Sequence, residues 1–275
     1  MNLGDLDRES GLFPNTEKMT VLFLGHGSPM NAIEENQFVD GFRNLAKTLP
    51  KPNAILCISA HWYINGTKVT AMKMPPTIHD FGGFPEELYD VQYPAQGRHE
   101  LAKETQQLLS PAIVELDQKW GLDHGAWSVI KHLYPNADVP VIELSIDNTK
   151  SPEYHFNLAK QLGALRDKGI LIIGSGNIVH NLRLVDWHNF DKDNYGLDWA
   201  IEARETINQW ILEGNYQPVI DYDMQIRAIQ LAVPTPDHYL PLLYALGLKG
   251  KTDKIEFFND KMVAGSLSMT SLKIS

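Results

Sequence analysis

The sequence predicts an α/β fold, namely a single domain with a mainly parallel, mixed central sheet flanked by helices on both faces. Three short apolar runs rich in Ile, Leu and Val are bounded by Gly or Ser, which is typical of strands buried on both faces. They lie at residues 20–24, 54–59 and 170–173. Segments with apolar residues at helical spacing alternate with these runs, and this alternation predicts parallel strands joined by helices.

The length of the chain favours one domain. Its 275 residues are near the upper limit for one hydrophobic core, and no linker or internal repeat divides them. Residues 1–19 contain several acidic residues and no long apolar stretch, so we expect a mobile N-terminal leader there, and neither a signal peptide nor a membrane anchor. Residues 20–275 then form the domain.

The composition excludes several classes of partner. The formal net charge of -10 argues against nucleic acid and membrane surfaces, because both kinds of binding depend on clustered Lys and Arg. No stretch approaches the roughly 18 consecutive apolar residues that span a bilayer. Cys57 is the only cysteine, so no internal disulfide can form, which fits a cytoplasmic protein. We therefore expect a small-molecule substrate.

The elements of the first half follow from periodicity and from Pro and Gly. Helical spacing predicts helices over 34–49 and 98–109. A hairpin partner is predicted over 67–72, and a further buried strand over 139–145. The loop over 74–85 is rich in Pro, Gly and aromatic residues, and long loops of this kind usually cover or frame a site.

The second half continues the alternation. A helix is predicted over 152–168, because Ser151 is a good N-cap and Gly169 a good helix end. The remaining predicted elements are helices at 197–212 and 239–246 and closing strands at 254–258 and 262–273.

A histidine follows each of the three apolar runs. These histidines are His26, His61 and His180. In open α/β sheets ligands bind outside the carboxyl ends of the strands, so we expect these imidazoles to converge. His238 stands between prolines just before a predicted helix, where a rigid backbone can aim a ligating side chain. Taken singly, each fits a structural role, but converging neutral imidazoles commonly hold a transition metal.

Two further histidines have two interpretations each. His124 lies in a Gly-flanked turn beside Asp123, which either orients the imidazole for acid/base chemistry or belongs to a plain helix start. His79 lies in the loop over 74–85, where it either reaches a substrate or stabilises the loop through a hydrogen bond.

Six motifs spread along the chain carry a resemblance to a known family. They are Leu-Gly-His-Gly-Ser-Pro-Met at 24–30, Ser-Ala-His-Trp at 59–62, Pro-Pro-Thr-Ile-His-Asp-Phe-Gly-Gly-Phe at 75–84, Asp-His-Gly-Ala-Trp at 123–127, Gly-Ser-Gly-Asn-Ile-Val-His-Asn-Leu at 174–182 and Thr-Pro-Asp-His-Tyr-Leu-Pro-Leu at 235–242. With these motifs the chain resembles the class III extradiol ring-cleaving dioxygenases, in the branch that includes DOPA 4,5-dioxygenase. The resemblance covers nearly everything from about residue 20 to the C-terminus.

The resemblance implies an extradiol dioxygenase-like catalytic domain over 20–275 that opens a catechol ring beside its two hydroxyls with molecular oxygen. His26 and His61 match the metal ligands of the family, and His238 falls where the third ligand is expected. His180 matches the acid/base group beside the metal, close enough to ligate it, and this role suits a pKa near neutrality. His124 would be a second catalytic donor or a hydrogen-bond partner of the substrate.

The substrate would be a catechol such as DOPA, opened by 4,5-cleavage, with O2 as the second substrate. The candidate substrate-binding residues are Trp62, His79, Phe81 and Tyr239. The three aromatic members of this set fit either a substrate-binding wall or the core. The sequence leaves the oligomeric state open, a homo-oligomer included.

The metal is expected to be one divalent ion. The wider class uses two histidines and a carboxylate, whereas this chain presents His238 with Asp237 beside it. If His238 is the ligand, the all-histidine site suits Zn(II) as readily as Fe(II), although oxygen chemistry calls for Fe(II).

Three other functions fit the same histidines. A zinc-dependent hydrolase would use them to activate water. The Gly-His-Gly-Ser turn after the first strand also resembles tetrapyrrole metal chelatases, although the histidines of the other motifs exceed what a chelatase needs. A metal-binding module without catalysis is the alternative that is not an enzyme.

Overall fold

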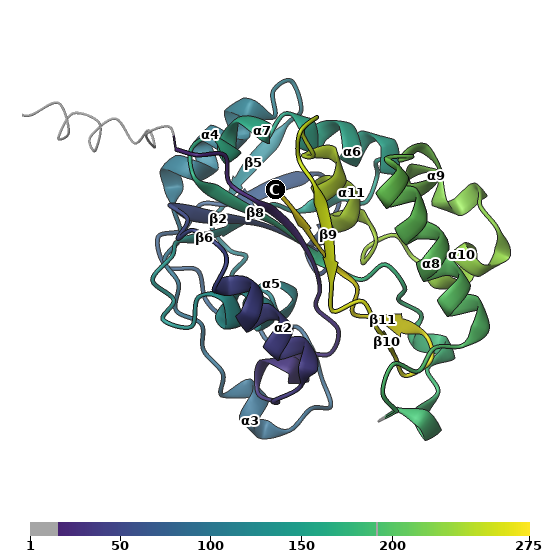
Figure 1. Cartoon of the computed structure of the whole chain (residues 1–275). Coiled ribbons are helices and arrows are strands. Elements are labelled where there is room, and N and C mark those ends of the chain that lie inside the picture. The colour runs from purple at the N-terminus through teal and green to yellow at the C-terminus, as the bar shows by residue number, and fades with distance from the viewer. Residues whose placement is uncertain (1–15, 191) are drawn as a thin grey trace, which may run out of the picture.

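The core of the protein is a six-stranded sheet in the order β6-β2-β8-β1-β12-β9, seen in a computed structural model that describes residues 16–190 and 192–275 (Figure 1). Its strands are β1 (Val21–Gly25), β2 (Ala54–Ser59), β6 (Val141–Glu143), β8 (Ile170–Gly176), β9 (Ile255–Phe258) and β12 (Ser271–Ile274). Strands β6, β2, β8 and β1 are parallel, β12 is antiparallel to β1, and β9 is antiparallel to β12. The predicted mainly parallel, mixed sheet is confirmed.

Each central strand is buried on both faces. In β1, Val21 and Phe23 pack into one hydrophobic core, while Leu22 and Leu24 pack into a second core on the opposite face. Side chains alternate across a strand, so a continuous apolar run supplies both cores at once. This is why the three runs carry no polar residue until they reach the sheet edge.

Helices cover both faces, as the sequence predicts (Figure 1). The helices on one face are α2 (Gln37–Ala46), α3 (Glu86–Tyr89) and α5 (His124–Leu133). Those on the other face are α4 (His99–Leu108), α6 (Pro152–Lys160), α7 (Gly163–Arg166), α8 (Asp198–Glu213), α9 (Gln217–Ile220), α10 (Arg227–Ala232) and α11 (Leu240–Gly247). Short 3-10 turns lie at Pro29–Ala32, Leu182–Leu184, Trp187–Asn189 and Tyr222–Met224.

Three predicted elements differ from the structure. The segment expected to form a hairpin at 67–72 is β4 (Thr67–Thr70), which pairs in parallel with the unpredicted β5 (Val114–Asp117). The helix expected over 152–168 is divided into α6 and α7, although Ser151 caps it and Gly169 follows it at φ +70° as expected.

The last closing strand, expected over 262–273, is divided into β10 (Met262–Val263), β11 (Leu267–Ser268) and β12. Strands β10 and β11 pair with each other outside the large sheet. A further small pair joins β3 (Tyr63–Ile64) to β7 (Ile146–Asp147).

The end of the expected N-terminal leader is bound to the domain. The amide of Thr16 donates to the carbonyl of Asp167 over 2.6 Å, and the amide of Met19 donates to that of Arg166 over 2.9 Å. Residues 1–15 of the expected leader lie outside the described residues. Among the described residues, no helix has both the length and the apolar character needed to cross a bilayer.

Candidate metal centre

The three histidines that follow the predicted strands meet at one edge of the sheet. Strands β2, β8 and β1 are neighbours and run in parallel, so their carboxyl ends lie side by side. His26 directly follows β1, and the centroid of its ring lies 5.1 Å from that of His61, just beyond β2. His180 follows β8 and lies near enough to His26 to help lower the pKa of its imidazole. The structure thus brings together side chains that are up to 154 positions apart (180 - 26).

His238 joins them from the segment before α11. Its ring centroid lies 5.2 Å from that of His26 and 5.0 Å from that of His61. It stacks on His180 with centroids 3.6 Å apart and an interplanar angle of 7°. The backbone of His238 lies close to Gly176, where any Cβ would clash with the carbonyl oxygen of His238. The same oxygen accepts a hydrogen bond of 2.8 Å from the amide of Asn177.

A serine at the end of β8 determines which nitrogen of His26 carries the hydrogen. The Ser175 hydroxyl donates to the carbonyl of Gly125 over 2.5 Å, so its only hydrogen is committed. The Nδ1 atom of His26, 3.0 Å from the same hydroxyl oxygen, must therefore donate to it. This leaves Nε2 of His26 with a lone pair.

Asp80, in the loop over 74–85, faces two other imidazoles at once. Its Oδ1 accepts from Nδ1 and from the backbone amide of His124, both over 2.9 Å. Its Oδ2 lies 3.3 Å from Nδ1 of His61. Burial alone would raise the pKa of Asp80, but the hydrogen bonds and charge of His124 hold it below its ordinary value. The carboxylate therefore favours Nδ1–H, with a lone pair on Nε2, in both rings.

The aspartate that was expected to orient His124 has another role. Asp123 is the N-cap of α5: its Oδ1 accepts from the amide of Ala126 over 3.1 Å and from the hydroxyl of Ser59 over 2.6 Å. The turn is therefore a helix start, and it also places His124 beside an orienting carboxylate, although this carboxylate is Asp80 and not Asp123.

His238 is oriented by the residue before it. Its Nδ1 hydrogen-bonds to Oδ2 of Asp237. Burial would raise the pKa of Asp237, but this hydrogen bond, the charge of His238 and a hydrogen bond with Thr235 together lower it. The neighbouring carboxylate thus acts as a partner of the imidazole.

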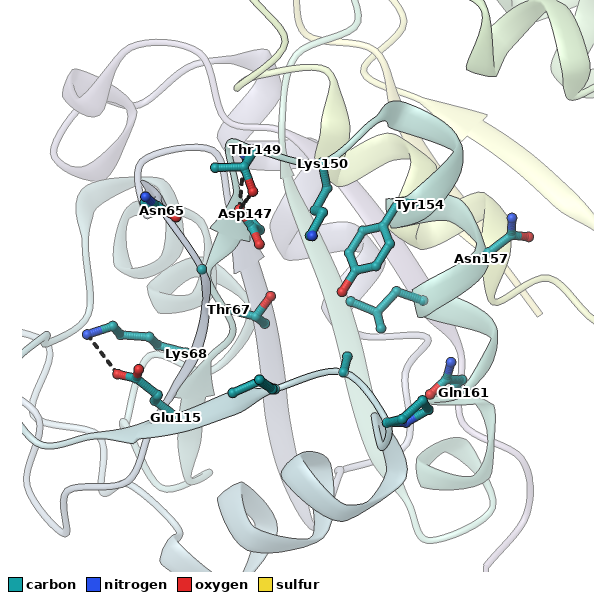
Figure 2. Close-up of a pocket in the computed structure, with 15 residues that line it drawn as sticks. Asn65, Thr67, Lys68, Glu115, Asp147, Thr149, Lys150, Tyr154, Asn157 and Gln161 are labelled. Atoms are coloured by element: carbon teal, nitrogen blue, oxygen red, sulfur yellow. Dashed lines mark hydrogen bonds and ion pairs between the residues drawn. The ribbon is translucent and has the colours of Figure 1, made fainter.

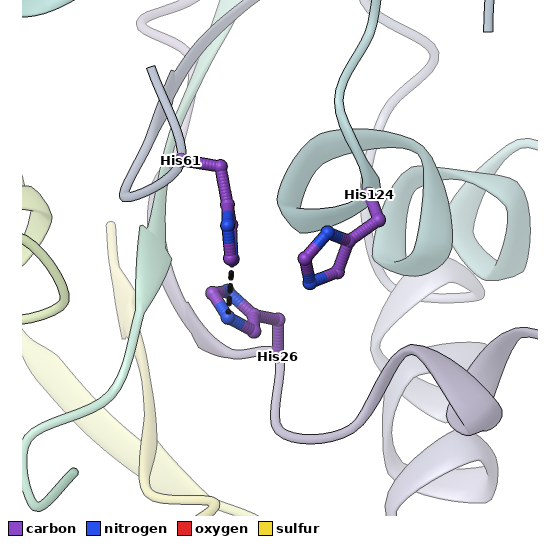
Figure 3. Close-up of side chains that lie close together, drawn as sticks. All are labelled: His26, His61 and His124. Carbon is purple, nitrogen blue, oxygen red and sulfur yellow. Dashed lines mark hydrogen bonds between the residues drawn. The ribbon is translucent and has the colours of Figure 1, made fainter. Parts of the chain in front are cut away.

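The lone pairs of the cluster fit a metal ion. The Nε2 atoms of His26 and His61 face each other 3.3 Å apart (Figure 3). With the hydrogen of each ring on Nδ1, both Nε2 atoms carry a lone pair. Two facing lone pairs repel unless a cation attracts both. Nitrogens 3.3 Å apart and each about 2.1 Å from one ion subtend roughly 100° at that ion, near the tetrahedral angle. With His124, they form a group whose ligand atoms all lie within 4.8 Å of one another.

Burial keeps several of these imidazoles neutral. It lowers the pKa of His26 and His61, and the neighbouring imidazoles lower both further. The pKa of His180, expected near neutrality, is instead lowered to about 3 by burial and by His238, although Asp237 acts in the opposite direction. Neutral imidazole is the form that ligates metals, and it suits Fe(II) or Zn(II).

The expected substrate-binding residues lie in different surroundings. Phe81 packs edge-on against His124 with centroids 5.4 Å apart. His79 hydrogen-bonds through Nε2 to the carbonyl of Val91 over 2.9 Å, which is the contact that a loop-stabilising role requires. Trp62 is 2% exposed and stacks on Trp120, and Tyr239 is 1% exposed, so the structure places both in the core.

Two orienting residues were not singled out in the sequence. Ser175 and Asp80 lie inside the motifs that carry the resemblance, but the sequence alone assigns neither of them a role. The available signal was a polar residue between two glycines at a strand end for Ser175, and a carboxylate in a loop expected to frame a site for Asp80. Which imidazole each would contact depends on how distant segments pack.

A cavity of about 640 Å³ lies apart from this cluster (Figure 2). It is lined by residues of β4, β5, β7 and α6 and of the segments beside them, among them Lys68, Asp147, Lys150 and Tyr154. None of the clustered histidines lines it.

Comparisons with known proteins agree with this geometry. A model of the family described as the catalytic LigB subunit of aromatic ring-opening dioxygenase matches residues 20–272. A 4,5-DOPA dioxygenase extradiol of Escherichia coli (strain K12) is 46% identical over 264 residues, covering 94% of this chain and 96% of the relative. A protein of the same name from Beta vulgaris is 35% identical over 92% of this chain and 95% of its own length. The crystal structure of an uncharacterized Escherichia coli K12 protein matches with a TM-score of 0.78 and 40% identity, over 94% of this chain and 100% of that one.

Proposed function

The chain belongs to the LigB family of aromatic ring-opening dioxygenases, and we propose that it opens catechols such as DOPA by 4,5-cleavage with molecular oxygen. The observation that carries the proposal is the convergence of neutral imidazoles with inward lone pairs at the sheet edge. The relatives named 4,5-DOPA dioxygenase support the substrate class. The same matches favour this activity over a hydrolase, a chelatase or a module without catalysis.

The proposed metal is Fe(II), held by His26, His61 and His238. His124 is also within reach of the same ion, and His180 remains a candidate ligand because it stacks on His238. When bound, ferrous iron supplies the redox chemistry that lets dioxygen react with an aromatic ring. Zn(II) fits the same donors and would compete for the site on isolation.

His180 is the proposed acid/base group. With its pKa lowered to about 3 by burial and by His238, it begins the reaction as a neutral base that accepts a proton before it can donate one. A catechol hydroxyl would supply that proton to a ring nitrogen, and the nearby carboxylate of Asp237 favours the resulting cation. His180 would then return the proton to the opened product.

His124 and Phe81 are the proposed contacts to the substrate. His124 keeps its Nε2 unprotonated while Asp80 accepts from Nδ1, so it would accept a hydrogen bond from a catechol hydroxyl. Phe81 packs on that ring and is part of an aromatic group with Phe84 and Tyr89. An aromatic surface beside the imidazoles suits a planar ring.

Turnover of a catechol tests the proposal. The protein is loaded with Fe(II) without oxygen, DOPA is added, and air is admitted while absorbance is recorded. We expect a yellow ring-opened product, and a His61→Ala variant should lose at least about 100-fold in rate, since losing a mere partner of a ligand costs roughly 10–100-fold. The exposed His188, substituted by Ala, is the matched control and should keep full activity. No product from DOPA or several other catechols would contradict the proposal and favour the alternatives.

A further inference from the structure

Asp80 occupies an unusual place among the polar groups around the imidazoles. It comes from the loop over 74–85, whereas the rings that it faces come from the end of β2 and from the start of α5. Its side chain is only 19% exposed. One carboxylate therefore contacts imidazoles from two other segments of the chain.

The two oxygens of Asp80 have separate partners. Oδ1 receives two N–H groups of His124, from the ring and from the backbone, both over 2.9 Å. Oδ2 faces Nδ1 of His61 over 3.3 Å. The two rings consequently lie close together, with centroids 3.8 Å apart and planes inclined by 51°.

We propose that Asp80 is a shared positioning residue that sets the tautomer and orientation of both His61 and His124, and so leaves a lone pair on Nε2 of His61 for the metal and on Nε2 of His124 for a hydrogen-bond donor beside it. The inference rests on the proposed metal centre but not on the identity of the substrate. A hydrogen on Nδ1 of an imidazole forces the lone pair onto Nε2, and a carboxylate is the strongest acceptor for that hydrogen. Because one group serves two rings, its loss affects two nitrogens of the centre at once.

The substitution Asp80→Asn should change the tautomer of one imidazole and leave that of the other unchanged. The amide oxygen would stay at the Oδ1 position, because two N–H groups of His124 point at it. The amide NH2 would then face Nδ1 of His61, where two donors oppose each other. His61 relieves the conflict by moving its hydrogen to Nε2, the atom that lies 3.3 Å from Nε2 of His26. His61 would then have no lone pair for the metal, while His124 would keep its tautomer.

Two measurements test the inference, namely the affinity for Zn(II) and the tautomers of His61 and His124. Zn(II) alone is titrated into metal-free protein in competition with a chromophoric chelator, so no catechol is involved. We expect Asp80→Asn to weaken Zn(II) binding roughly 10–100-fold, and Asp80→Glu, which keeps the carboxylate, to recover part of the loss. Asp90→Asn removes the same charge from an exposed position nearby and should leave the affinity unchanged. Long-range ¹H–¹⁵N spectra of the metal-free wild type should show Nδ1–H in both His61 and His124, and Nε2–H in His61 alone after Asp80→Asn.

The outcomes separate a positioning role from a structural one. Wild-type affinity in Asp80→Asn, or Nε2–H in either histidine of the wild type, would overturn the inference, as would a lower Tm with unchanged tautomers and affinity. If Asp80→Asn does not fold, the wild-type spectrum and Asp80→Glu decide. A wild type that binds Zn(II) but opens no catechol would contradict the proposed function and leave this test intact.

Discussion

Individual histidines are distinguished in this protein by their hydrogen-bond partners. His155 is fully buried, accepts at Nδ1 from the Tyr244 hydroxyl over 3.0 Å and donates from Nε2 to the carbonyl of Asp147 over 3.1 Å. Both ring nitrogens are used up, so this ring has no free lone pair. His26, in contrast, keeps a lone pair on Nε2 because Ser175 occupies only Nδ1. Burial of a histidine alone therefore does not indicate a metal site.

The buried histidines predict how stability depends on pH. Burial lowers the pKa of His155 to about 4, below the ordinary value of 6.5 that the unfolded chain retains. Between these values the unfolded state binds a proton that the folded state does not bind, so the free energy of unfolding falls as the pH is lowered from about 6.5 towards 4. The slope is at most about 1.4 kcal/mol per pH unit for each such histidine.

Urea unfolding of metal-free protein at several pH values in this window measures that slope. His155→Gln, whose amide can keep both hydrogen bonds, should reduce the slope by up to that amount. His188→Gln, at an exposed position, should leave it unchanged. Equal slopes in His155→Gln and the wild type would show that His155 does not carry the effect.

The strand β8 shows how an element can be shaped by its neighbours. Gly174 and Gly176 lie against the backbone of Pro241 and His238, where any Cβ would clash. The sequence correctly predicts β8 as a strand, because its apolar run and the Gly and Ser residues that end it are local signals. The close approach of the chain around His238 is not local, so the reason for these glycines became visible only in the fold.

Pairing between elements was predicted less well than their existence. The six residues of β2 agree with the prediction, whereas β4 pairs with β5, which lies more than forty residues further along the chain. The sequence indicates no more than the start of helix α5, because nine of its ten residues are buried and leave little polar face to reveal the helical period. Apolar content indicates burial, but it does not identify the partner.

Substitution of Gly176 tests the packing of β8 against the His238 segment. Gly176→Ala should displace the carbonyl of His238 and with it the ring, weakening Zn(II) binding at least about 10-fold and destabilising the fold by about 1–3 kcal/mol. Gly163→Ala is the matched control, since its Cβ would meet nothing within 4 Å in a helix, and it should be neutral or stabilising by up to about 1 kcal/mol. Chelator competition and urea unfolding measure both effects. Wild-type metal binding in Gly176→Ala would contradict this account of the glycine.

The whole molecule brings its site together from six separate segments. The strand-end rule predicted the convergence of His26, His61 and His180, because topology alone places the carboxyl ends of parallel neighbours at one edge. It could not predict that Asp80 would face two of the imidazoles, since this depends on how a long loop closes over the sheet edge. The side-chain environment also lowered the pKa of His180 further than a sequence could indicate.

The central claim is that imidazoles from separate strands share one metal ion. Anomalous diffraction from crystals of the Fe(II)- or Zn(II)-loaded protein, recorded on both sides of the metal absorption edge, tests it most directly. The account predicts one peak within about 2.0–2.2 Å of Nε2 of both His26 and His61, with His238 completing the protein ligands. A metal bound elsewhere, or His26 and His61 without a common peak, would contradict it.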